Sequence, residues 1–370
     1  MLIGVPTEIK EKEYRVGMVP AGVKALVQAG HGVLVQQGAG TASGIPDQEY
    51  AGAGASLVAE AAAIYGSADL IIKVKEPLAQ EVALLRPGQI LFTYLHLAPA
   101  PELTDSLITS RVRAVAYETV QLDNGFLPLL SPMSQVAGRL AIQAGARFLE
   151  KEAGGRGVLL AGVPGVAAGH VTILGSGTVA TNAAQMALGL GARTTILGRN
   201  LKKLAGLDAL FQGRLTTLAL NRHNIEEELT KADLLVTAIY VPGSRPPQLV
   251  SRKMLGLMKK GAVIVDVAID QGGCLETSRP TSHSDPVFEV DGILHYCVAN
   301  MPGAVPWTST FALTNATLPY CLAMADHGLE TAARQDPALF RGITLFDGQL
   351  VSRQVAAAQN KSWQPLEFQK

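Results

Sequence analysis

The sequence of 370 residues contains few charged residues and no excess of either sign. Charged residues make up 17% of the chain and apolar residues 48%, whereas a disordered chain needs the opposite balance. Lysine plus arginine and aspartate plus glutamate number 31 each, so there is no overall basic field to hold nucleic acid or an anionic membrane. Because a neutral monomer this apolar would dissolve poorly, the composition favours a homo-oligomer with buried interfaces.

Long hydrophobic runs, a targeting segment and paired cysteines are also absent. No apolar run reaches the ~20 residues that cross a bilayer, since the best candidate, residues 157–174, is interrupted by Pro164 and Gly165. The chain starts directly with the strand-like run Leu2–Val5, unlike a signal peptide. The three cysteines are far apart and form no CxxC pair, which predicts reduced thiols. We therefore expect a cytoplasmic protein that does not bind membranes.

Short apolar runs alternate with helical patterns along the chain. Most of the expected strands are β-branched and continuous, as strands buried on both faces are. They form two series, Leu2–Val5, Gly32–Gln36, Asp69–Lys75, Gln89–His96 and Arg113–Val120, then His170–Leu174, Arg193–Leu197, Arg214–Leu218, Asp233–Tyr240, Ala262–Ala268 and Ile293–Val298. Helices are expected between them, including Ala21–Ala29, Val179–Gly189 and Arg252–Lys259. This alternation predicts an α/β fold with mainly parallel sheets.

Two longer helical patterns bracket the second strand series. One runs over about Ser134–Glu152, after the helix-start signal Ser131-Pro132, and the other over about Trp307–His327. This layout predicts two Rossmann-like domains, with a central dinucleotide-binding domain inserted into a discontinuous substrate domain. The expected limits are 1–128 and 307–370 for the substrate domain, and 129–306 for the dinucleotide-binding domain with its connecting helix. Beyond residue 328 the sequence predicts only a closing helix and strand.

The most specific motif is a glycine-rich turn between a predicted strand and a helix. Residues 171–180 read Val-Thr-Ile-Leu-Gly-Ser-Gly-Thr-Val-Ala, an apolar strand running into G-x-G-x-x-A. In this context Gly175 makes the tight turn, Gly177 lets the backbone approach a pyrophosphate, and Ala180 keeps the helix close to the sheet. The pyrophosphate would lie at the helix N-terminus. The motif predicts a dinucleotide site, and the alternative is a glycine turn without a ligand.

The acid expected about 20 residues later is missing. It would hydrogen-bond the adenosine ribose, but its place reads Leu197-Gly198-Arg199-Asn200. Arg199, with Lys202 and Lys203 close by, could face a 2′-phosphate instead. Alternatively, these cations form a solvated surface at a helix start. The sequence leaves NAD and NADP both open.

Two lysines and a histidine lie at the ends of predicted strands. Lys73 and Lys75 share one face by strand periodicity, at a sheet edge that suits an anionic or carbonyl substrate. They could equally be snorkelling lysines. His96 could act as an acid–base group near neutral pH, although a lone histidine is more often structural.

Further polar candidates lie in two other segments. Arg15 belongs to a charge cluster at residues 8–15, and its guanidinium has the geometry to bind a carboxylate bidentately. Most such clusters are solvated. Asp270 ends a buried-type strand and is expected at the edge of the central sheet, facing the cofactor cleft. Asp266 lies within that strand and is expected to be structural.

Together these motifs closely resemble the L-alanine dehydrogenase family, over almost the whole chain from Gly4 to about Leu329. The most specific segments are Lys73-Val-Lys-Glu-Pro, Leu91-Phe-Thr-Tyr-Leu-His-Leu-Ala, Ser131-Pro-Met-Ser, Val265-Asp-Val-Ala-Ile-Asp-Gln-Gly-Gly and Asn300-Met-Pro-Gly-Ala-Val-Pro-Trp-Thr. Membrane transhydrogenase NAD-binding subunits and saccharopine dehydrogenases look like more distant relatives.

The resemblance implies roles for the polar residues. Arg15 would bind the substrate carboxylate, Lys75 the pyruvate carbonyl or its imine, His96 would be the acid–base group, and Asp270 would complete the site beside the nicotinamide. The residues implied to bind the cofactor are Met133, Ser134, Gly175, Gly177, Thr178, Val179, Ala180, Gly198, Arg199, Lys203, Ile239, Val267, Asp270, Arg279, Val298, Asn300 and Met301.

The resemblance also implies the reaction: reversible oxidative deamination of L-alanine to pyruvate and ammonium with NAD, in a cytosolic homohexamer. Two positions depart from the family pattern, Gly198 in place of the ribose-binding acid and Leu220 in place of a serine on the adenine side. A related NADPH-dependent amino- or imino-acid oxidoreductase and a non-catalytic dinucleotide-binding protein therefore stay open. No metal site is expected, since His327 has Ala323 rather than an acid one turn earlier.

Overall fold

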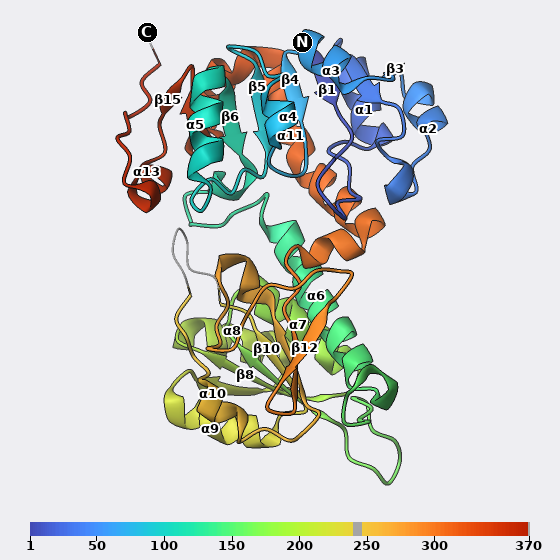
Figure 1. The fold of residues 1–370 in the computed structure, drawn as a ribbon, viewed down its shortest axis with the longest axis vertical. Coiled ribbons are helices and arrows are strands. Elements are labelled where there is room, and N and C mark those ends of the chain that lie inside the picture. The colour runs from blue at the N-terminus through green and yellow to red at the C-terminus, as the bar shows by residue number, and fades with distance from the viewer. Residues whose placement is uncertain (240–245, 369–370) are drawn as a thin grey trace. The chain divides into compact units, whose positions relative to one another are not determined.

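The computed structural model describes residues 1–239 and 246–368. The chain divides into two compact units (Figure 1). Unit 1 comprises Met1–Met133 and Val305–Lys370, and unit 2 comprises Ser134–Ala304. The chain therefore passes between units at 133/134 and 304/305, whereas the sequence analysis placed these limits at 128/129 and 306/307. Assigning the substrate to unit 1 and the dinucleotide to unit 2 remains a prediction.

Unit 1 contains an eight-stranded sheet in the order β15-β14-β6-β5-β4-β1-β2-β3. The strands are β1 Leu2–Val5, β2 Gly32–Gln36, β3 Ser56–Val58, β4 Leu70–Ile72, β5 Ile90–Thr93, β6 Arg113–Ala116, β14 Ile343–Phe346 and β15 Gln349–Leu350. Strands β1 to β6 pair in parallel, and β14 and β15 add an antiparallel edge. The inner strands β4 and β5 are buried along their whole length, as their apolar sequences predict.

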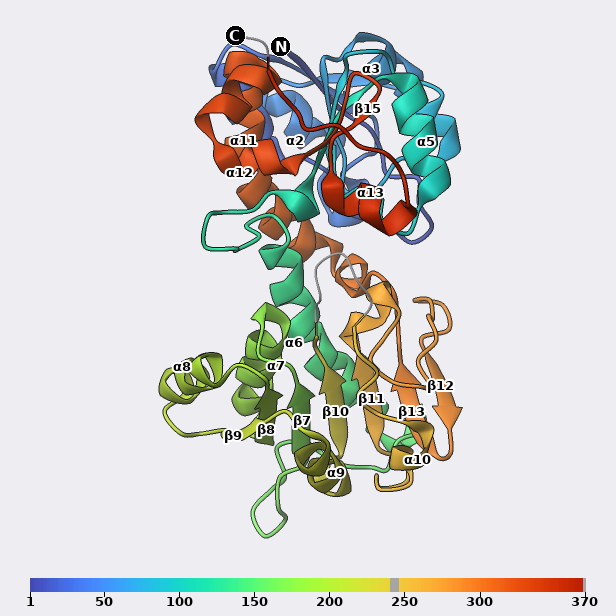
Figure 2. The ribbon, with the colours of Figure 1, turned by 90° about the vertical axis from the view of Figure 1, so that its left-hand side faces the viewer.

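Helices surround this sheet (Figure 2). They are α1 Pro20–Gln28, α2 Asp47–Gly52, α3 Ala61–Ser67, α4 Ala79–Val82, α5 Pro101–Ser110, α11 Pro306–Gln335, α12 Pro337–Gly342 and α13 Arg353–Gln359. Helices α1, α5, α11 and α12 carry proline in their first turn, where no intrahelical N–H bond is lost. The chain of α11 is interrupted at Gly328, whose φ is +75°.

Unit 2 contains a seven-stranded sheet in the order β12-β13-β11-β10-β7-β8-β9. The strands are β7 His170–Leu174, β8 Arg193–Gly198, β9 Thr216–Ala219, β10 Leu234–Thr237, β11 Val263–Asp266, β12 Val287–Val290 and β13 Ile293–Tyr296. Numbered along the chain, the six parallel strands have the order 3-2-1-4-5-6 of a dinucleotide-binding Rossmann sheet. Only β12 is antiparallel. The expected strand end at Tyr240 lies outside the described residues.

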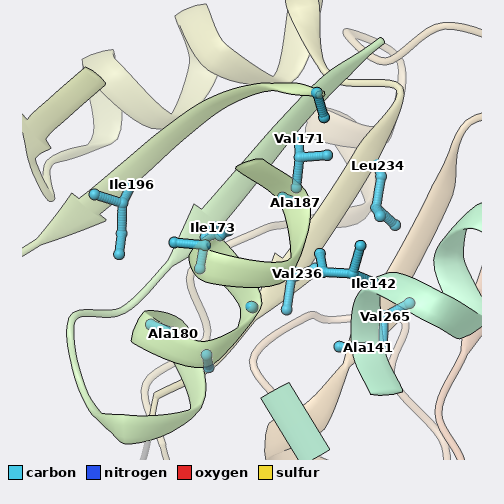
Figure 3. Close-up of a cluster of buried hydrophobic side chains, with 14 of the residues drawn as sticks. Ala141, Ile142, Val171, Ile173, Ala180, Ala187, Ile196, Leu234, Val236 and Val265 are labelled. Carbon is cyan, nitrogen blue, oxygen red and sulfur yellow. The ribbon is translucent and has the colours of Figure 1, made fainter. Parts of the chain in front are cut away.

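The helices of unit 2 are α7 Thr178–Gly189, α8 Leu201–Phe211, α9 Arg222–Lys231 and α10 Arg252–Leu255, while α6 Ser131–Phe148 continues from the end of unit 1. Figure 3 shows how small side chains, Ala141 on α6 and Ala180 and Ala187 on α7, let both helices lie close to the apolar strands β7 and β10. In the part of the chain that the structure describes, no helix is long and apolar enough to cross a membrane.

Several expected strands are longer than the observed ones at their carboxyl ends. Strand β4 ends at Ile72 instead of Lys75, β5 at Thr93 instead of His96, and β11 at Asp266 instead of Ala268. In each case apolar residues such as Val74, Leu95 and Val267 continue past the end of the hydrogen-bonded ladder, so the apolar pattern does not show where the strand ends. The carboxyl ends of parallel strands are where ligands bind in such sheets.

Candidate active site

The glycine-rich turn of unit 2 has the geometry that a pyrophosphate needs. Gly175 has φ of +132°, and a Cβ there would lie 2.4 Å from the Ala238 carbonyl oxygen, so only glycine fits. Gly177 directly precedes α7, and a Cβ at Gly177 would meet nothing within 4 Å. The first turn of α7 contains no acid. The N-terminal N–H groups of α7 and this open space fit an anion. The residues therefore fit the dinucleotide that the motif predicts.

Asp270 follows β11 on a short 3-10 turn, Val267–Gln271, and is exposed. Its carboxylate accepts a hydrogen bond from the backbone N–H of Asn300 at 3.2 Å. Asn300 has φ of +65°, and its carbonyl oxygen lies 3.2 Å from Nε2 of His283. Asp270 and Asn300, both expected near the cofactor and 30 positions apart in sequence, are thus hydrogen-bonded to each other within unit 2.

Asp266 holds the segment that carries Asp270. Its fully buried carboxylate accepts four hydrogen bonds, from the Thr237 hydroxyl at 2.5 Å, Ala268 N–H at 3.1 Å, Cys274 N–H at 3.0 Å and the Ser278 hydroxyl at 2.5 Å. A buried carboxylate with all its acceptor positions used is structural. The structure confirms the structural role expected for Asp266.

The other residues expected to bind the cofactor lie near the carboxyl ends of the unit 2 strands or in helices that begin there. Thr178 and Val179 are the first residues of α7, and Gly198 is the last residue of β8. Arg199 and Lys203 lie at the start of α8. Three more residues follow strands: Ile239 follows β10, Val267 follows β11 and Val298 follows β13. Met301 is buried, and Ser134 lies in the first two turns of α6. The Arg279 guanidinium lies 4.1 Å above the centre of the Phe288 ring, a cation–π contact that fixes its direction.

In unit 1, Arg15 is buried and oriented by Glu13. The guanidinium donates from Nε and Nη2 to the two Glu13 carboxylate oxygens at 2.7 and 2.6 Å, and its Nη1 lies 3.1 Å from Met133 Sδ. Burial disfavours the charged guanidinium, but the Glu13 carboxylate outweighs it and raises the Arg15 pKa. The expectation that this charge cluster is solvated is wrong for Glu8, Glu13 and Arg15, which are all buried.

The two lysines after β4 have different environments. Lys73 is fully buried, and its Nζ donates to Glu81 at 2.6 Å and to Glu8 at 3.1 Å, so it is neither a snorkelling nor a ligand-facing lysine. Lys75 is half-buried. The Glu8 carboxylate also accepts the N–H of Val74 at 2.6 Å and that of Lys75 at 3.4 Å. The buried pair therefore fixes the backbone that presents Lys75.

His96 follows β5 in a strained backbone conformation, with φ of +47°. Its backbone N–H donates to Glu118 Oε1 at 2.7 Å, and Leu95 N–H donates to the same carboxylate at 3.3 Å. The imidazole is 44% exposed, with Nδ1 4.0 Å from Glu118, and stacks parallel to the Tyr94 ring at 5.7 Å. The residue therefore has a fixed position and an accessible ring.

Arg15, Lys75 and His96 follow β1, β4 and β5, which are adjacent in the sheet. All three residues thus come from one edge of unit 1. Glu118 follows the next strand, β6, and the sequence analysis missed it. The one signal in the sequence was an acid near the carboxyl end of the predicted strand Arg113–Val120, the next expected strand after that of His96. No group of three or more metal-binding side chains is present among the described residues.

Comparison with known proteins gives matches over the whole chain. The family described as Alanine dehydrogenase/PNT matches with its N-terminal domain at residues 4–137 and its C-terminal domain at residues 141–353. An alanine dehydrogenase of Methanococcus maripaludis is 52% identical over 368 residues, 99% of each chain. One of Mycobacterium tuberculosis is 52% identical over 356 residues, 96% of each chain.

Solved structures agree. An L-alanine dehydrogenase structure has 51% sequence identity and a TM-score of 0.94, covering 97% of this chain and 99% of that one. A transhydrogenase of Sinorhizobium meliloti, at 24% identity and a TM-score of 0.82, covers 95% of this chain and 99% of that one, and shares the fold. The chain belongs to the alanine dehydrogenase/PNT family.

Proposed function

We propose that this chain catalyses the reversible oxidative deamination of L-alanine. L-Alanine, water and an oxidised nicotinamide dinucleotide give pyruvate, ammonium, the reduced dinucleotide and a proton. The observation that carries this proposal is a chain 52% identical over 99% of its length to an alanine dehydrogenase, with the four polar residues of the predicted reacting centre present. Adjacent strand ends in unit 1 supply three of them, Arg15, Lys75 and His96.

The dinucleotide, when bound, accepts the hydride that leaves the Cα of alanine. Arg15 binds the substrate carboxylate, and Glu13 holds the plane of its guanidinium so that Cα keeps one orientation. Lys75 donates a hydrogen bond to the oxygen that becomes the carbonyl of pyruvate and stabilises the charge that develops there.

His96 handles the protons. Hydride loss leaves an iminium, and water adds to its carbon while the His96 imidazole takes a proton from that water. The same group then assists collapse of the carbinolamine to pyruvate and ammonium. Its accessible ring and fixed backbone suit this role. Asp270, on the turn after β11, completes the site beside the nicotinamide.

Two other functions make different predictions. A protein that binds dinucleotides without turnover has no need for the set Arg15, Lys75, His96 and Asp270, and the presence of all four argues against it. A related oxidoreductase acting on a different amino or imino acid would share the binding properties but not the substrate. Binding alone does not separate these proposals, so turnover must be measured.

The direct experiment supplies the purified full chain with an oxidised dinucleotide and one amino acid at a time. We expect L-alanine to support reduction of the nicotinamide, pyruvate to accumulate in equal amount, and D-alanine to be inactive. Faster reduction with another L-amino acid would show that L-alanine is not the preferred substrate, while the proposed oxidative deamination would stand. No reduction with any of them, despite nucleotide binding, would support the protein without turnover.

We further propose that the chain acts in the cytoplasm as a homo-oligomer, with a hexamer expected from the family. The low content of charge supports a buried interface. So do the apolar side chains at residues 159–166, where Leu159 is 65% and Val166 63% exposed. Light scattering measures the assembly, and a mass equal to one chain of 38.8 kDa would contradict it.

A further inference from the structure

A cavity of about 380 Å³ lies in unit 2 beyond β8 and β9. Its lining includes the apolar side chains of Leu220, Ile225 and Met254, which suit the flat face of an adenine ring. Arg199 and Arg222 also line it, and none of the described lining residues is acidic. In a Rossmann sheet this is where the adenosine end of a dinucleotide binds.

Gly198 removes the group that would recognise a free ribose hydroxyl. It is the last residue of β8 and is buried. A Cβ there would lie 2.9 Å from Ser176 Cβ and 3.0 Å from Leu204 Cδ2. Neighbouring side chains therefore occupy the space in which a ribose-binding carboxylate would begin.

The charged side chains that directly follow this strand end, Arg199, Lys202 and Lys203, are all positive. Among the described residues Arg199 has no hydrogen-bond or ion-pair partner, and it is exposed. Lys202 and Lys203 follow in the first turn of α8, which contains no acid. Cations at a helix N-terminus are unfavourable because they face the positive end of the helix dipole. A bound anion near Arg199 accounts for this arrangement.

Arg222, at the start of α9, is the second cation that lines the cavity. Its Nε donates to Glu226 at 2.8 Å along the same helix, so its charge is partly balanced. Arg199 is therefore the main candidate for a bidentate contact, with Lys203 and Arg222 adding to the field around it.

We propose that this adenosine end selects a dinucleotide whose ribose carries a 2′-phosphate, so that NADP is the preferred cofactor of the chain. The inference names the cofactor of the proposed reaction and rests on that proposal. A phosphomonoester carries a charge of about −1.5 to −2 at neutral pH. The Arg199 guanidinium matches two of its oxygens. Position 198 lacks the carboxylate that usually accepts from a 2′-hydroxyl, so no carboxylate there repels the phosphate.

Calorimetric titration of the full chain with adenosine fragments tests this without turnover. The probes are 2′,5′-ADP, which carries a phosphate on O2′ in addition to that on O5′, and 5′-AMP, which carries the 5′-phosphate alone. We expect 2′,5′-ADP to bind at least about tenfold more tightly, the scale of one charge-assisted contact, and this advantage to shrink as salt rises. Equal affinities, or tighter binding of 5′-AMP, would overturn the inference.

Arg199→Ala identifies the residue responsible. Because Arg199 is exposed and makes no local contact, the variant is expected to fold, which circular dichroism checks. Its affinity for 2′,5′-ADP should fall about 10- to 100-fold while that for 5′-AMP stays nearly unchanged. Arg353→Ala is the matched control, since Arg353 is also exposed in the first turn of a helix, α13, but lies in unit 1. An equal fall in the control would show that Arg199 has no specific role.

Rates with both reduced cofactors separate the two proposals. If 2′,5′-ADP is preferred but neither NADPH nor NADH is oxidised with pyruvate and ammonium, the proposed function is wrong and the 2′-phosphate site stands. If NADH alone supports turnover and 5′-AMP binds as tightly as 2′,5′-ADP, the 2′-phosphate site is wrong and the proposed function stands.

Discussion

At the residue scale, buried and half-buried carboxylates orient the groups proposed to react. Glu13 holds the guanidinium of Arg15, Glu8 holds the backbone of Lys75, and Glu118 holds the backbone of His96. Each acid lies on a different segment from the strand whose end it stabilises, except Glu13, which is two residues from Arg15. The reactive side chains thus depend on a second set of residues that need not touch the substrate.

Glu118 is a positioning residue for His96 on this account. A left-handed backbone costs about 1–3 kcal/mol for a residue other than glycine, and the Glu118 carboxylate stabilises it through two N–H groups. Glu118→Ala should lower kcat/KM about 10- to 100-fold. It should also shift the limb of the pH profile of kcat/KM that is lost in His96→Ala. Glu118→Gln, which keeps an acceptor, should recover part of the rate.

Glu102→Gln serves as the control for Glu118, since Glu102 is an exposed acid on α5. If Glu118→Ala alters stability but leaves the pH profile in place, Glu118 is merely structural.

Lys73 neutralises two carboxylates inside unit 1. Burial favours the neutral carboxyl and raises the Glu8 pKa, although the charge of Lys73 opposes that rise. For Lys73, burial favours the neutral amine, but the two carboxylates outweigh burial and raise its pKa. Lys73→Met would leave Glu8 and Glu81 without their cation, and we expect the free energy of unfolding to fall by about 3–5 kcal/mol. Urea denaturation measures this, with the exposed Lys24→Met as control. Equal midpoints for the two variants would contradict a structural role.

The sequence suggested the residues that we propose to react, but not the residues that hold them in place. Lys75 and His96 were predicted from strand ends and from the family resemblance. Glu118 and Glu8 were not, because an acid that accepts backbone N–H groups shows its role only when two strands distant in sequence pair. The sequence showed that Gly198 and Arg199 stand where a ribose-binding acid is expected. Only the structure shows that Ser176 and Leu204 fill the space that the side chain of such an acid would occupy.

At the element scale, the close approach of α6 and α7 depends on Gly138. A Cβ at Gly138 would lie 2.3 Å from the Val179 carbonyl oxygen and 3.1 Å from Ala183 N. Gly138→Ala should therefore lower the free energy of unfolding by about 1–3 kcal/mol, although alanine normally stabilises a helix. Gly206→Ala, in α8 where nothing lies within 4 Å, should raise it by about 0.5–1 kcal/mol. Thermal melts of both variants compare them, and stabilisation by Gly138→Ala would contradict the contact.

Asp233 joins several elements of unit 2 at the start of β10. Its carboxylate accepts His170 N–H at 2.9 Å and pairs with Arg156 at 2.5 Å and Lys259 at 3.0 Å. Burial raises the Asp233 pKa, but these donors outweigh it and lower the pKa below its usual value of 3.8. The stabilisation is therefore complete above the unfolded pKa and is lost as pH falls through the lower folded pKa.

We expect the free energy of unfolding to decrease below about pH 4, and the decrease to be smaller in Asp233→Asn, which has no titrating carboxylate there. Urea denaturation at a series of acidic pH values measures both slopes. A pH slope in Asp233→Asn equal to that of the unchanged chain would assign the acid sensitivity to other carboxylates.

The inner elements were predictable and the edges were not. Continuous β-branched runs predicted the central strands of both sheets, because burial on both faces imposes that composition. Strand β3, of three residues, and β12, an antiparallel edge strand, escaped prediction since neither is fully buried. Strand ends were overestimated where apolar residues continue past the ladder into the turns that carry Lys75, His96 and Asp270.

At the scale of the whole molecule, the chain leaves unit 1, forms unit 2 and returns to unit 1. Alternating strands and two long helical patterns predicted this interrupted arrangement. The proposed chemistry divides between the units, with Arg15, Lys75 and His96 in unit 1 and the dinucleotide turn and Asp270 in unit 2. Turnover therefore tests the whole molecule, whereas binding of nucleotide tests unit 2 alone.

The most direct test of the central claim is the initial rate of nicotinamide oxidation with pyruvate and ammonium, using NADPH and NADH in parallel. We predict oxidation that requires both pyruvate and ammonium, yields L-alanine, and is more efficient with NADPH. Binding of either dinucleotide with no oxidation under these conditions would contradict the proposed reaction.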